Sequence, residues 1–223
     1  MIRYFPDLIQ GTEAWLAARC GLLTASEMKL ILTPTLKAAS NDKERGHLYE
    51  LLAQRITQHV EPHYISDDML RGMEDELTAR DLYSEKYAPA TQCGFVTNDR
   101  WGVTIGCSPD GLVGDDGMIE IKSRRQKYQI ETIVSGEMPA DYLMQVQTAL
   151  LVTERAWCDF VTYSGGLPML TLRVFPDAKV HDAIIAAALA FEDRIAIRLD
   201  QYHAALGSLR SIPTERRVEQ EMF

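Results

Sequence analysis

A tight turn between two short apolar runs places the strongest constraint on how this chain can fold. Residues 114–117 are Gly-Asp-Asp-Gly, which is typical of a β-hairpin turn, and residues 118–122 are Met-Ile-Glu-Ile-Lys. Because side chains alternate between the two faces of a strand, Glu120 and Lys122 are expected on one face, with the two neighbouring isoleucines pointing into the core. Asp110 begins the preceding strand, so the hairpin is expected to bring its carboxylate toward Glu120.

Two carboxylates and an ammonium group at one place suit the hydrolysis of a phosphodiester. Carboxylate oxygens are ligands that Mg²⁺ and Mn²⁺ prefer, and such an ion polarises a phosphate and lowers the pKa of an attacking water. Lys122 would then orient or deprotonate that water, or neutralise charge in the transition state. The alternative is an ordinary solvated Glu–Lys strand face beside an Asp-Gly turn. Pro109-Asp110 at the strand entry, with this spacing and these apolar flanks, favours an active site.

The rest of the chain shows helical and strand patterns in an order typical of an α+β domain. The expected helices cover residues 12–20, 24–32, 44–59, 66–88, 140–152 and 177–206. The expected strands cover residues 94–97, 101–105, 118–122, 156–163 and 168–175. The helix at residue 24 is expected from the capping-box pattern Thr24-Ala-Ser-Glu27. We therefore expect a mixed central sheet flanked by helices, with a long C-terminal helix. Residues 1–208 would form a single domain and residues 209–223 a polar tail.

The charge and the cysteines limit the classes of function. The formal net charge is −9, which is unusual for a protein that contacts DNA phosphates. Either the acids lie around metal ions and on the outer face, with the basic residues gathered in a channel, or the chain is not a nuclease. The charge alone favours the second explanation, so a nuclease must be argued from the motif. None of the four cysteines is in a Cys-x-x-Cys pair, so reduced thiols are expected rather than a zinc or iron–sulfur site. His59 and His63 are separated by Pro62 and are expected in a loop.

No segment approaches the roughly 20 apolar residues that a membrane span needs. The first residues also lack the apolar core of a signal peptide. A cytoplasmic location without membrane contact is therefore expected.

Several sequence blocks occur in order around the acidic pair. Pro109-Asp110 and Glu120-Ile-Lys122 match the PD-(D/E)xK nuclease motif. The longer blocks are Trp15…Arg19-Cys-Gly-Leu-Leu-Thr-Ala-Ser26-Glu, Gly72-Met-Glu-Asp-Glu76…Ala79, Cys107-Ser-Pro-Asp-Gly and Tyr142-Leu-Met-Gln145-Val-Gln147…Val152-Thr…Ala156-Trp157. Each block is weak alone, but together they make the chain resemble the phage lambda exonuclease family and its YqaJ-type viral recombinase relatives.

This resemblance implies a restriction-endonuclease-like fold and a Mg²⁺-dependent 5′→3′ exonuclease, with Mn²⁺ as a substitute and two ions during catalysis. Such an enzyme degrades one strand of linear double-stranded DNA to mononucleotides and leaves 3′ single-stranded overhangs. The resemblance also implies a phage or prophage protein that assembles as a ring-shaped homotrimer. Its partner would be a single-strand annealing protein that uses the overhangs for recombination.

The resemblance assigns roles to residues at matching positions. The implied metal ligands are Asp110, Glu120, Glu76 and the main-chain carbonyl of Ile121. Lys122 is the implied catalytic lysine, and Gln145 is implied to position the nucleophile or the substrate. From the sequence alone, an exposed acid in an acidic run is the favoured interpretation of Glu76. The alternative for Gln145 is an amide on a helix surface.

Further residues are implied in DNA binding. Arg19 and Ser26 match a pocket for the 5′-phosphate, and an arginine with a hydroxyl near a helix N-terminus makes a suitable anion site. Met69 matches an apolar residue that wedges between the strands at the DNA fork. Arg124 and Arg125 belong to a run more basic than that of the lambda enzyme, and one or both are expected to contact phosphates. The alternatives are a helix-end cation for Arg19 and core packing for Met69.

Two other functions fit the same motif. One is a related nuclease: a restriction-type endonuclease, or an enzyme with an iron–sulfur cluster, which the scattered cysteines disfavour. The other is a non-catalytic protein that binds DNA ends, which the intact set of Asp110, Glu120 and Lys122 disfavours.

Overall fold

Two β-sheets lie on either side of one buried helix in the computed structural model, which describes residues 1–62 and 66–216. The first sheet has the order β1 (Ile2–Phe5), β4 (Phe95–Asn98), β5 (Ile105–Cys107) and β2 (Leu23–Thr24). The second has the order β3 (Ala90–Thr91), β6 (Gly111–Val113), β7 (Gly117–Ser123), β8 (Trp157–Tyr163) and β9 (Leu170–Val174). The pairs β2–β5 and β7–β8 are parallel and the remaining pairs antiparallel, so both sheets are mixed.

The helices surround these sheets, and several begin at a side chain that caps free main-chain N–H groups. They are α1 (Glu13–Arg19), α2 (Met28–Ile31), α3 (Asp42–Thr57), α4 (Asp67–Lys86), α5 (Gln126–Ser135), α6 (Leu143–Thr153) and α7 (Ala178–Ser208), with a 3₁₀ turn at Ala140–Tyr142. Thr12 caps α1, Asn41 caps α3, Ser66 caps α4 and Asp177 caps α7. These caps fix the starts of the longer helices close to the positions that the sequence predicts.

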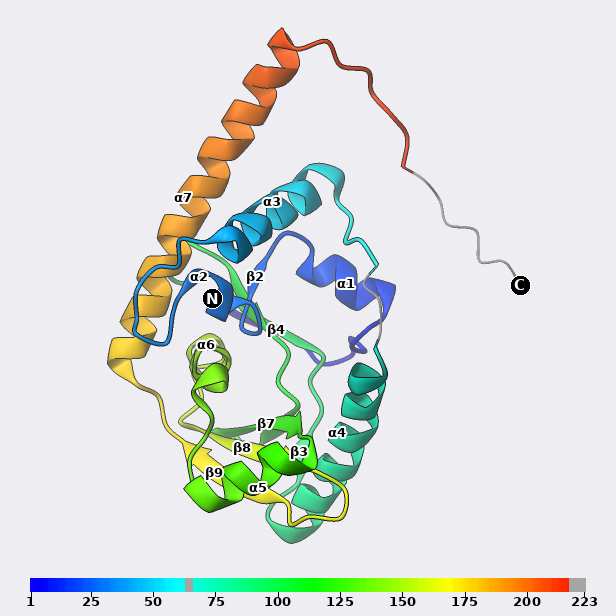
Figure 1. The fold of residues 1–223 in the computed structure, drawn as a ribbon, viewed down its shortest axis with the longest axis vertical. Helices are drawn as coiled ribbons and strands as arrows, with labels where there is room; N and C mark the ends of the chain where they lie inside the picture. The colour runs from blue at the N-terminus through cyan, green and yellow to red at the C-terminus, as the bar shows by residue number, and fades with distance from the viewer. Residues whose placement is uncertain (63–65, 217–223) are drawn as a thin grey trace, which may run out of the picture.

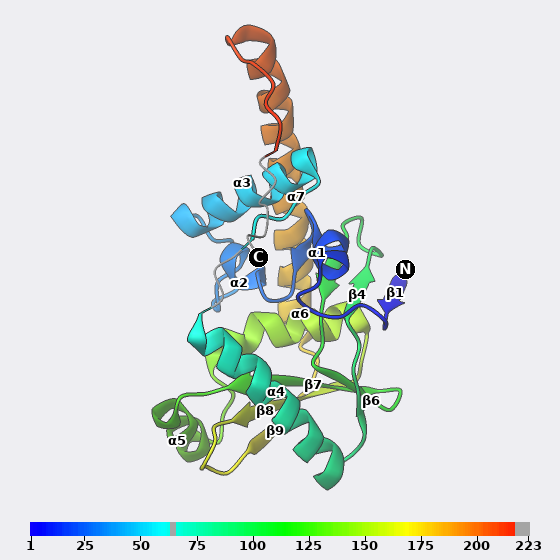
Figure 2. The same cartoon turned by 90° about the vertical axis from the view of Figure 1, so that its right-hand side faces the viewer.

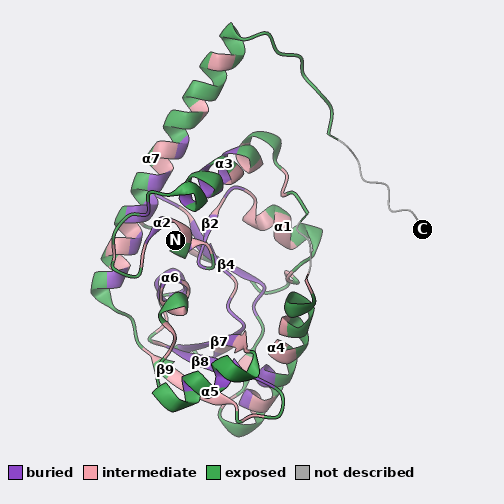
Figure 3. Ribbon diagram, in the orientation of Figure 1, coloured by how far each residue is buried: buried purple, intermediate pink, exposed green. Residues whose placement is uncertain are grey.

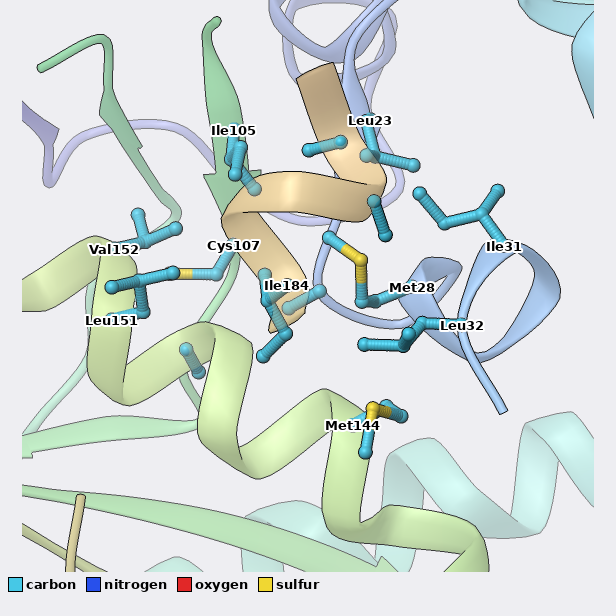
Figure 4. Close-up of a cluster of buried hydrophobic side chains, with 14 of the residues drawn as sticks. Leu23, Met28, Ile31, Leu32, Ile105, Cys107, Met144, Leu151, Val152 and Ile184 are labelled. Atoms are coloured by element: carbon cyan, nitrogen blue, oxygen red, sulfur yellow. The ribbon is translucent and has the colours of Figure 1, made fainter. Parts of the chain in front are cut away.

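The main hydrophobic core surrounds α6, which crosses the middle of the molecule between the two sheets (Figures 1 and 2). Val146, Ala149 and Val152 of α6 are buried, as expected for a helix enclosed on all sides. Side chains of α2, β5 and α7 close around α6 from the side of the first sheet, as Figure 4 shows for Met28, Ile105 and Ile184. The helix thereby fixes the separation of the two sheets.

The second sheet is covered on both faces. Met118 and Phe160 face α6 as part of the main core, while Ile119 and Val161 pack with Tyr83 of α4 on the opposite face. A strand buried in this way is apolar over most of its length, with polar side chains only where they have partners.

The long helix α7 packs on the core from its start to about Leu199. Val180, Ile184, Phe191 and Ile195 are buried, whereas the last turns project beyond the rest of the fold and are exposed (Figures 1 and 3). Within residues 1–62 and 66–216, no helix combines the length and the apolar character needed to cross a membrane.

The expected α+β fold with a long C-terminal helix is confirmed, although two sheets stand where one central sheet was expected. The helix predicted from residue 24 is wrong at its start, because Thr24 belongs to β2 and α2 begins only at Met28. Strand β5 begins at Ile105, so the strand predicted over residues 101–105 is shifted. All four cysteines are free, and His63 lies outside the described residues.

Candidate active site

One cleft, with a volume of about 230 Å³, collects side chains from both halves of the molecule. Its lining comes from α1, β2, the segment that joins β5 to β6, β7, α4 and α6. The predicted site residues that line it are Arg19, Ser26, Glu76, Asp110, Glu120, Ile121, Lys122 and Gln145. The cleft thus brings together Arg19 and Gln145, which lie 126 positions apart in the sequence.

Asp110 lies where the chain passes from the first sheet to the second. Its side chain is buried, and its Oδ2 atom accepts a hydrogen bond of 2.6 Å from the main-chain N–H of Ile121. In the β6–β7 hairpin, Gly111 pairs with Ile119, which places Asp110 beside the strand position of Glu120. The hairpin geometry predicted from the sequence is therefore present.

Glu120 is 2% exposed and is held by two donors. Its Oε1 atom accepts a hydrogen bond of 2.6 Å from the Lys122 ammonium group and another from the side-chain amide of Gln145 on α6. Gln145 therefore points into the cleft, and the alternative of an amide on an exposed helix surface is wrong. The result is a carboxylate whose orientation is fixed from a strand and from a helix.

Glu76 reaches the cleft from α4, on the opposite face of the second sheet. It forms an ion pair of 3.2 Å with Arg80, one turn later on the same helix. The same Arg80 nitrogen donates a hydrogen bond of 3.0 Å to the main-chain carbonyl of Asp110. Arg80 thus links two acids of the cleft. Arg80 was not among the predicted site residues, although its spacing of four residues from Glu76 on a helix is typical of an ion pair.

The acids in the cleft strongly affect one another. Burial raises the pKa of Asp110 well above its ordinary value, and the carboxylates of Glu120 and Glu76 raise it further. Burial also raises the pKa of Glu76, against the opposing effect of Arg80. For Lys122 burial alone would lower the pKa, but Glu120 and Asp110 outweigh it and hold the pKa above the ordinary value. Lys122 is therefore an ammonium group in this arrangement and provides positive charge.

The donor atoms of the cleft fit a small, hard cation. Within the described part of the chain, no three histidine, cysteine, aspartate or glutamate side chains form a ready-made metal cluster. Mg²⁺ does not need one, because it binds through one or two carboxylates and takes its remaining ligands from water and substrate phosphates. Asp110 and Glu120, with the main-chain carbonyl of Ile121, offer such oxygens, and a divalent cation would relieve the repulsion that raises the pKa of Asp110.

The other end of the cleft has the composition of an anion site. The Arg19 guanidinium lies 4.2 Å above the ring of Trp15 and donates a hydrogen bond of 3.2 Å to the Thr24 hydroxyl. The hydroxyl oxygens of Thr24 and Ser26 are 3.2 Å apart. An arginine fork beside two hydroxyl groups suits a phosphate, and the aromatic ring restricts the arginine to one plane. Trp15 and Thr24 were not among the predicted site residues.

Three predicted residues lie outside the lining of this cleft. Met69 is 47% exposed on α4, so the alternative of core packing is wrong for it. Arg124 donates a hydrogen bond of 3.0 Å to the hydroxyl of Tyr142, and Arg125 forms an ion pair of 2.6 Å with Asp68. Both arginines follow β7 directly, at the start of α5.

Comparison with known proteins gave one family and several similar folds. The family model of the YqaJ-like viral recombinase domain matches residues 14–156. The crystal structure of an alkaline exonuclease from Laribacter hongkongensis is 32% identical, has a TM-score of 0.79 and aligns over 89% of this chain and 100% of its own. A structure of that enzyme in complex with dAMP has the same TM-score and coverage at 34% identity.

A phage-related exonuclease from Haemophilus somnus shares the fold at 13% identity, with a TM-score of 0.56 over 80% of this chain and 96% of its own. No curated protein sequence matches the chain.

Proposed function

Since the chain belongs to the YqaJ-like viral recombinase family, we propose that it is a Mg²⁺-dependent 5′→3′ exonuclease that degrades one strand of linear double-stranded DNA to mononucleotides. The observation that carries the proposal is the position of Asp110, Glu120 and Lys122 in the same cleft as Arg19 and Ser26. The product would be a duplex with 3′ single-stranded overhangs. The similarity to an alkaline exonuclease over the whole length of that enzyme supports a DNA substrate.

Different residues of the cleft would have different roles in hydrolysis. When bound, Mg²⁺ supplies Lewis acidity that polarises the scissile phosphate and increases the acidity of the attacking water. Asp110, Glu120 and the carbonyl of Ile121 would hold it, and Glu76 would help to hold a second ion. Mn²⁺ would substitute. Lys122 would stabilise the negative charge that develops on the phosphate oxygens. Lys122 and Gln145 both donate to the Glu120 carboxylate and keep it in its orientation.

The anion site would account for the proposed 5′→3′ direction of digestion and for the release of one nucleotide in each cycle. A terminal 5′-phosphate bound by Arg19 and Ser26 would place the next phosphodiester bond at the carboxylates, so each cycle would release one nucleotide. After each cut the new 5′-phosphate would move into the same site. The acids and the lysine of the cleft could also serve an endonuclease. A site that binds the end of the strand would restrict them to exonuclease activity.

The remaining parts of the proposal concern assembly and partners. We propose a homotrimeric ring around the DNA in the cytoplasm of a bacterial host, with a single-strand annealing protein that takes up the overhang. Met69, exposed at the start of α4, would separate the strands at the fork, and Arg124 and Arg125 would contact phosphates. A ring would also reconcile DNA binding with the net charge of −9, because the acids could lie outside and the basic side chains in the channel.

The decisive experiment compares linear with closed circular duplex DNA in the presence of Mg²⁺. The exonuclease should release mononucleotides from the linear substrate and leave the circle intact. Discrete bands from the circle would identify an endonuclease, and binding of ends without hydrolysis would identify a non-catalytic protein. Light scattering should give the mass of a trimer, and a monomer that digests long DNA without dissociating would contradict the ring.

A further inference from the structure

A second cavity, with a volume of about 130 Å³, shares Trp15, Arg19 and Thr24 with the cleft and extends away from it toward Glu27 and Glu50. Arg19 therefore borders two hollow regions. One contains the candidate active site and the other contains acidic side chains. A long side chain in such a position needs partners that hold it toward one of the two sides.

The Thr24 hydroxyl connects Arg19 to the second cavity. Its oxygen is 2.6 Å from Glu27 Oε2 and 3.2 Å from both the Arg19 guanidinium and the Ser26 hydroxyl. An ionised carboxylate only accepts hydrogen bonds, so Thr24 donates its single proton to Glu27. The Thr24 oxygen must then accept from Arg19 and from Ser26. Glu27 thereby sets the direction of the hydrogen bonds around both predicted phosphate-binding residues.

His47 of α3 lies next to Glu27. Its side chain is 1% exposed, and its ring stacks on Phe191 with centroids 5.8 Å apart and an interplanar angle of 17°. Nδ1 lies 3.2 Å from Glu50, and Nε2 lies 4.0 Å from Glu27 Oε2 without a hydrogen-bond partner in the described part of the chain. The imidazole is thus fixed by packing, and its unpaired nitrogen faces the carboxylate of Glu27.

The charge on Glu27 also acts on Arg19. Burial lowers the pKa of Arg19, and the carboxylate of Glu27 opposes this effect by stabilising the cation. Glu27 has the largest of the effects that oppose burial, although the two side chains form no direct ion pair within the described residues. The contact between them passes through the hydroxyl of Thr24.

We propose that Thr24, Glu27 and His47 form a positioning network that aims the Arg19 guanidinium at the terminal 5′-phosphate. This inference rests on the proposed 5′-phosphate site. Glu27 and His47 act through Arg19 and not by contact with the DNA. The network accounts for the position of Glu27 close to a site for a phosphate. The benefit of holding Arg19 in place outweighs the repulsion between the Glu27 carboxylate and the phosphate.

The test measures kcat/KM on two duplexes that differ only in a 5′-phosphate or a 5′-hydroxyl end. General damage to the enzyme lowers both values and cancels in their ratio, whereas misplacement of Arg19 lowers only the phosphate-dependent part. Glu27→Ala should reduce the ratio about tenfold, which is the lower end of the worth of a charge-assisted arginine–phosphate contact. Glu27→Gln keeps an oxygen that accepts from Thr24 and should stay within about twofold of the wild-type ratio.

Two further substitutions keep the test independent of the folding of Glu27→Ala. Thr24→Val removes the connecting hydroxyl at nearly constant volume and should lower the ratio like Glu27→Ala, while Thr24→Ser should retain it. His47→Phe keeps the stack on Phe191 but removes both nitrogens, and should lower the ratio by a smaller factor of about threefold. The matched control is Glu44→Gln. Glu44 is a buried acid on α3, like His47, and forms an ion pair of 2.9 Å with Arg194, so its replacement should leave the ratio unchanged.

Arg19→Ala, measured in parallel, distinguishes a failure of the positioning network from a failure of the proposed 5′-phosphate site. If it erases the preference for 5′-phosphate while Glu27→Ala and Thr24→Val keep the wild-type ratio, the network is refuted and the phosphate site stands. If Arg19→Ala itself keeps the ratio, the phosphate site is wrong and the network with it. An equal fall in Glu27→Gln and Glu27→Ala would show that the charge of Glu27, without its hydrogen bond to Thr24, accounts for the whole effect, which overturns the positioning network.

Discussion

Replacing Asp110 with asparagine should make the metal-free protein more stable and at the same time inactive. The cleft holds three carboxylates, of which Glu120 is paired with Lys122 at 2.6 Å and Glu76 with Arg80 at 3.2 Å. Among the described residues, no cation lies within ion-pair distance of the Asp110 carboxylate, which is fixed by the main-chain N–H of Ile121. Asp110 therefore carries the charge that the cleft does not compensate, and asparagine keeps both its shape and an oxygen for that N–H group.

The size of the effect follows from the repulsion between these acids. Two carboxylates at the roughly 4–6 Å over which charges shift one another's pKa repel by about 3–4 kcal/mol at an effective dielectric constant of about 20. The attraction between Lys122 and Asp110 offsets part of this repulsion. We therefore expect Asp110→Asn to raise the free energy of unfolding by about 1–3 kcal/mol. For a chain of this length, each kcal/mol corresponds to a rise of about 2–4 °C in the melting temperature.

The pH dependence gives a second signature. In the folded state the pKa of Asp110 is raised by burial and by its neighbouring acids, whereas in the unfolded state it is ordinary. Between these two values the folded state binds more protons than the unfolded state, so the free energy of unfolding falls as the pH rises from the ordinary carboxylate range. Asp110→Asn should flatten this decline. Mg²⁺ should stabilise the wild type most at high pH, because it requires the deprotonated carboxylate.

The assay is thermal unfolding with EDTA and with Mg²⁺, alongside nuclease activity. Asp159→Asn is the matched control, since Asp159 is equally buried but is paired with Arg173 at 2.8 Å and accepts a hydrogen bond of 2.6 Å from Tyr83. That substitution should destabilise the protein by about 1–2 kcal/mol, discounted for the exposure of Arg173. If Asp110→Asn lowers the melting temperature in EDTA as Asp159→Asn does, or keeps full activity, the account of the cleft is wrong.

The remaining predictions concern single contacts. Lys122→Met should lower kcat by about a hundredfold to a thousandfold through the loss of one charge-stabilising donor, while Mg²⁺ still raises the melting temperature; a normal kcat would remove Lys122 from the reaction. Tyr83→Phe should lower the free energy of unfolding in urea by about 1–3 kcal/mol, because Asp159 loses a buried donor, and should leave the reaction on DNA unchanged. Gly94→Ala should prevent folding as judged by circular dichroism, since the added Cβ atom would lie 1.7 Å from the main-chain oxygen of Leu8; a native spectrum would contradict that close approach.

The acidic centre of the cleft was predictable because its geometry is local. A short turn and the alternation of side chains along a strand place Asp110, Glu120 and Lys122 together without knowledge of the rest of the fold. Helix α5 was missed because its buried face is polar: Gln129 is buried and donates to the main-chain oxygens of Thr162 and Pro168. A pattern search for apolar periodicity cannot find such a helix.

The surroundings of the phosphate site depend on contacts that sequence patterns do not encode. The capping-box pattern at Thr24 predicted a helix start, but parallel pairing of Leu23 and Thr24 with β5 prevailed over that local preference. The Thr24 side chain consequently bonds to the Glu27 carboxylate and not to a main-chain N–H group. Tertiary packing brings Arg80 to the main chain of Asp110 and His47 to Glu27, and no local sequence pattern predicts these two contacts.

The central position of α6 has a consequence for the length of DNA removed in each cycle. This helix packs on β4 and β5 on one side and on β8 on the other, so it separates the part of the molecule that carries Arg19 from the part that carries Glu120. The spacing between the point that would hold a strand end and the point that would cut is therefore a dimension of the hydrophobic core, and a close-packed interior resists compression. Substitutions of buried α6 side chains such as Val146, which is not itself part of the cleft lining, should accordingly alter this spacing.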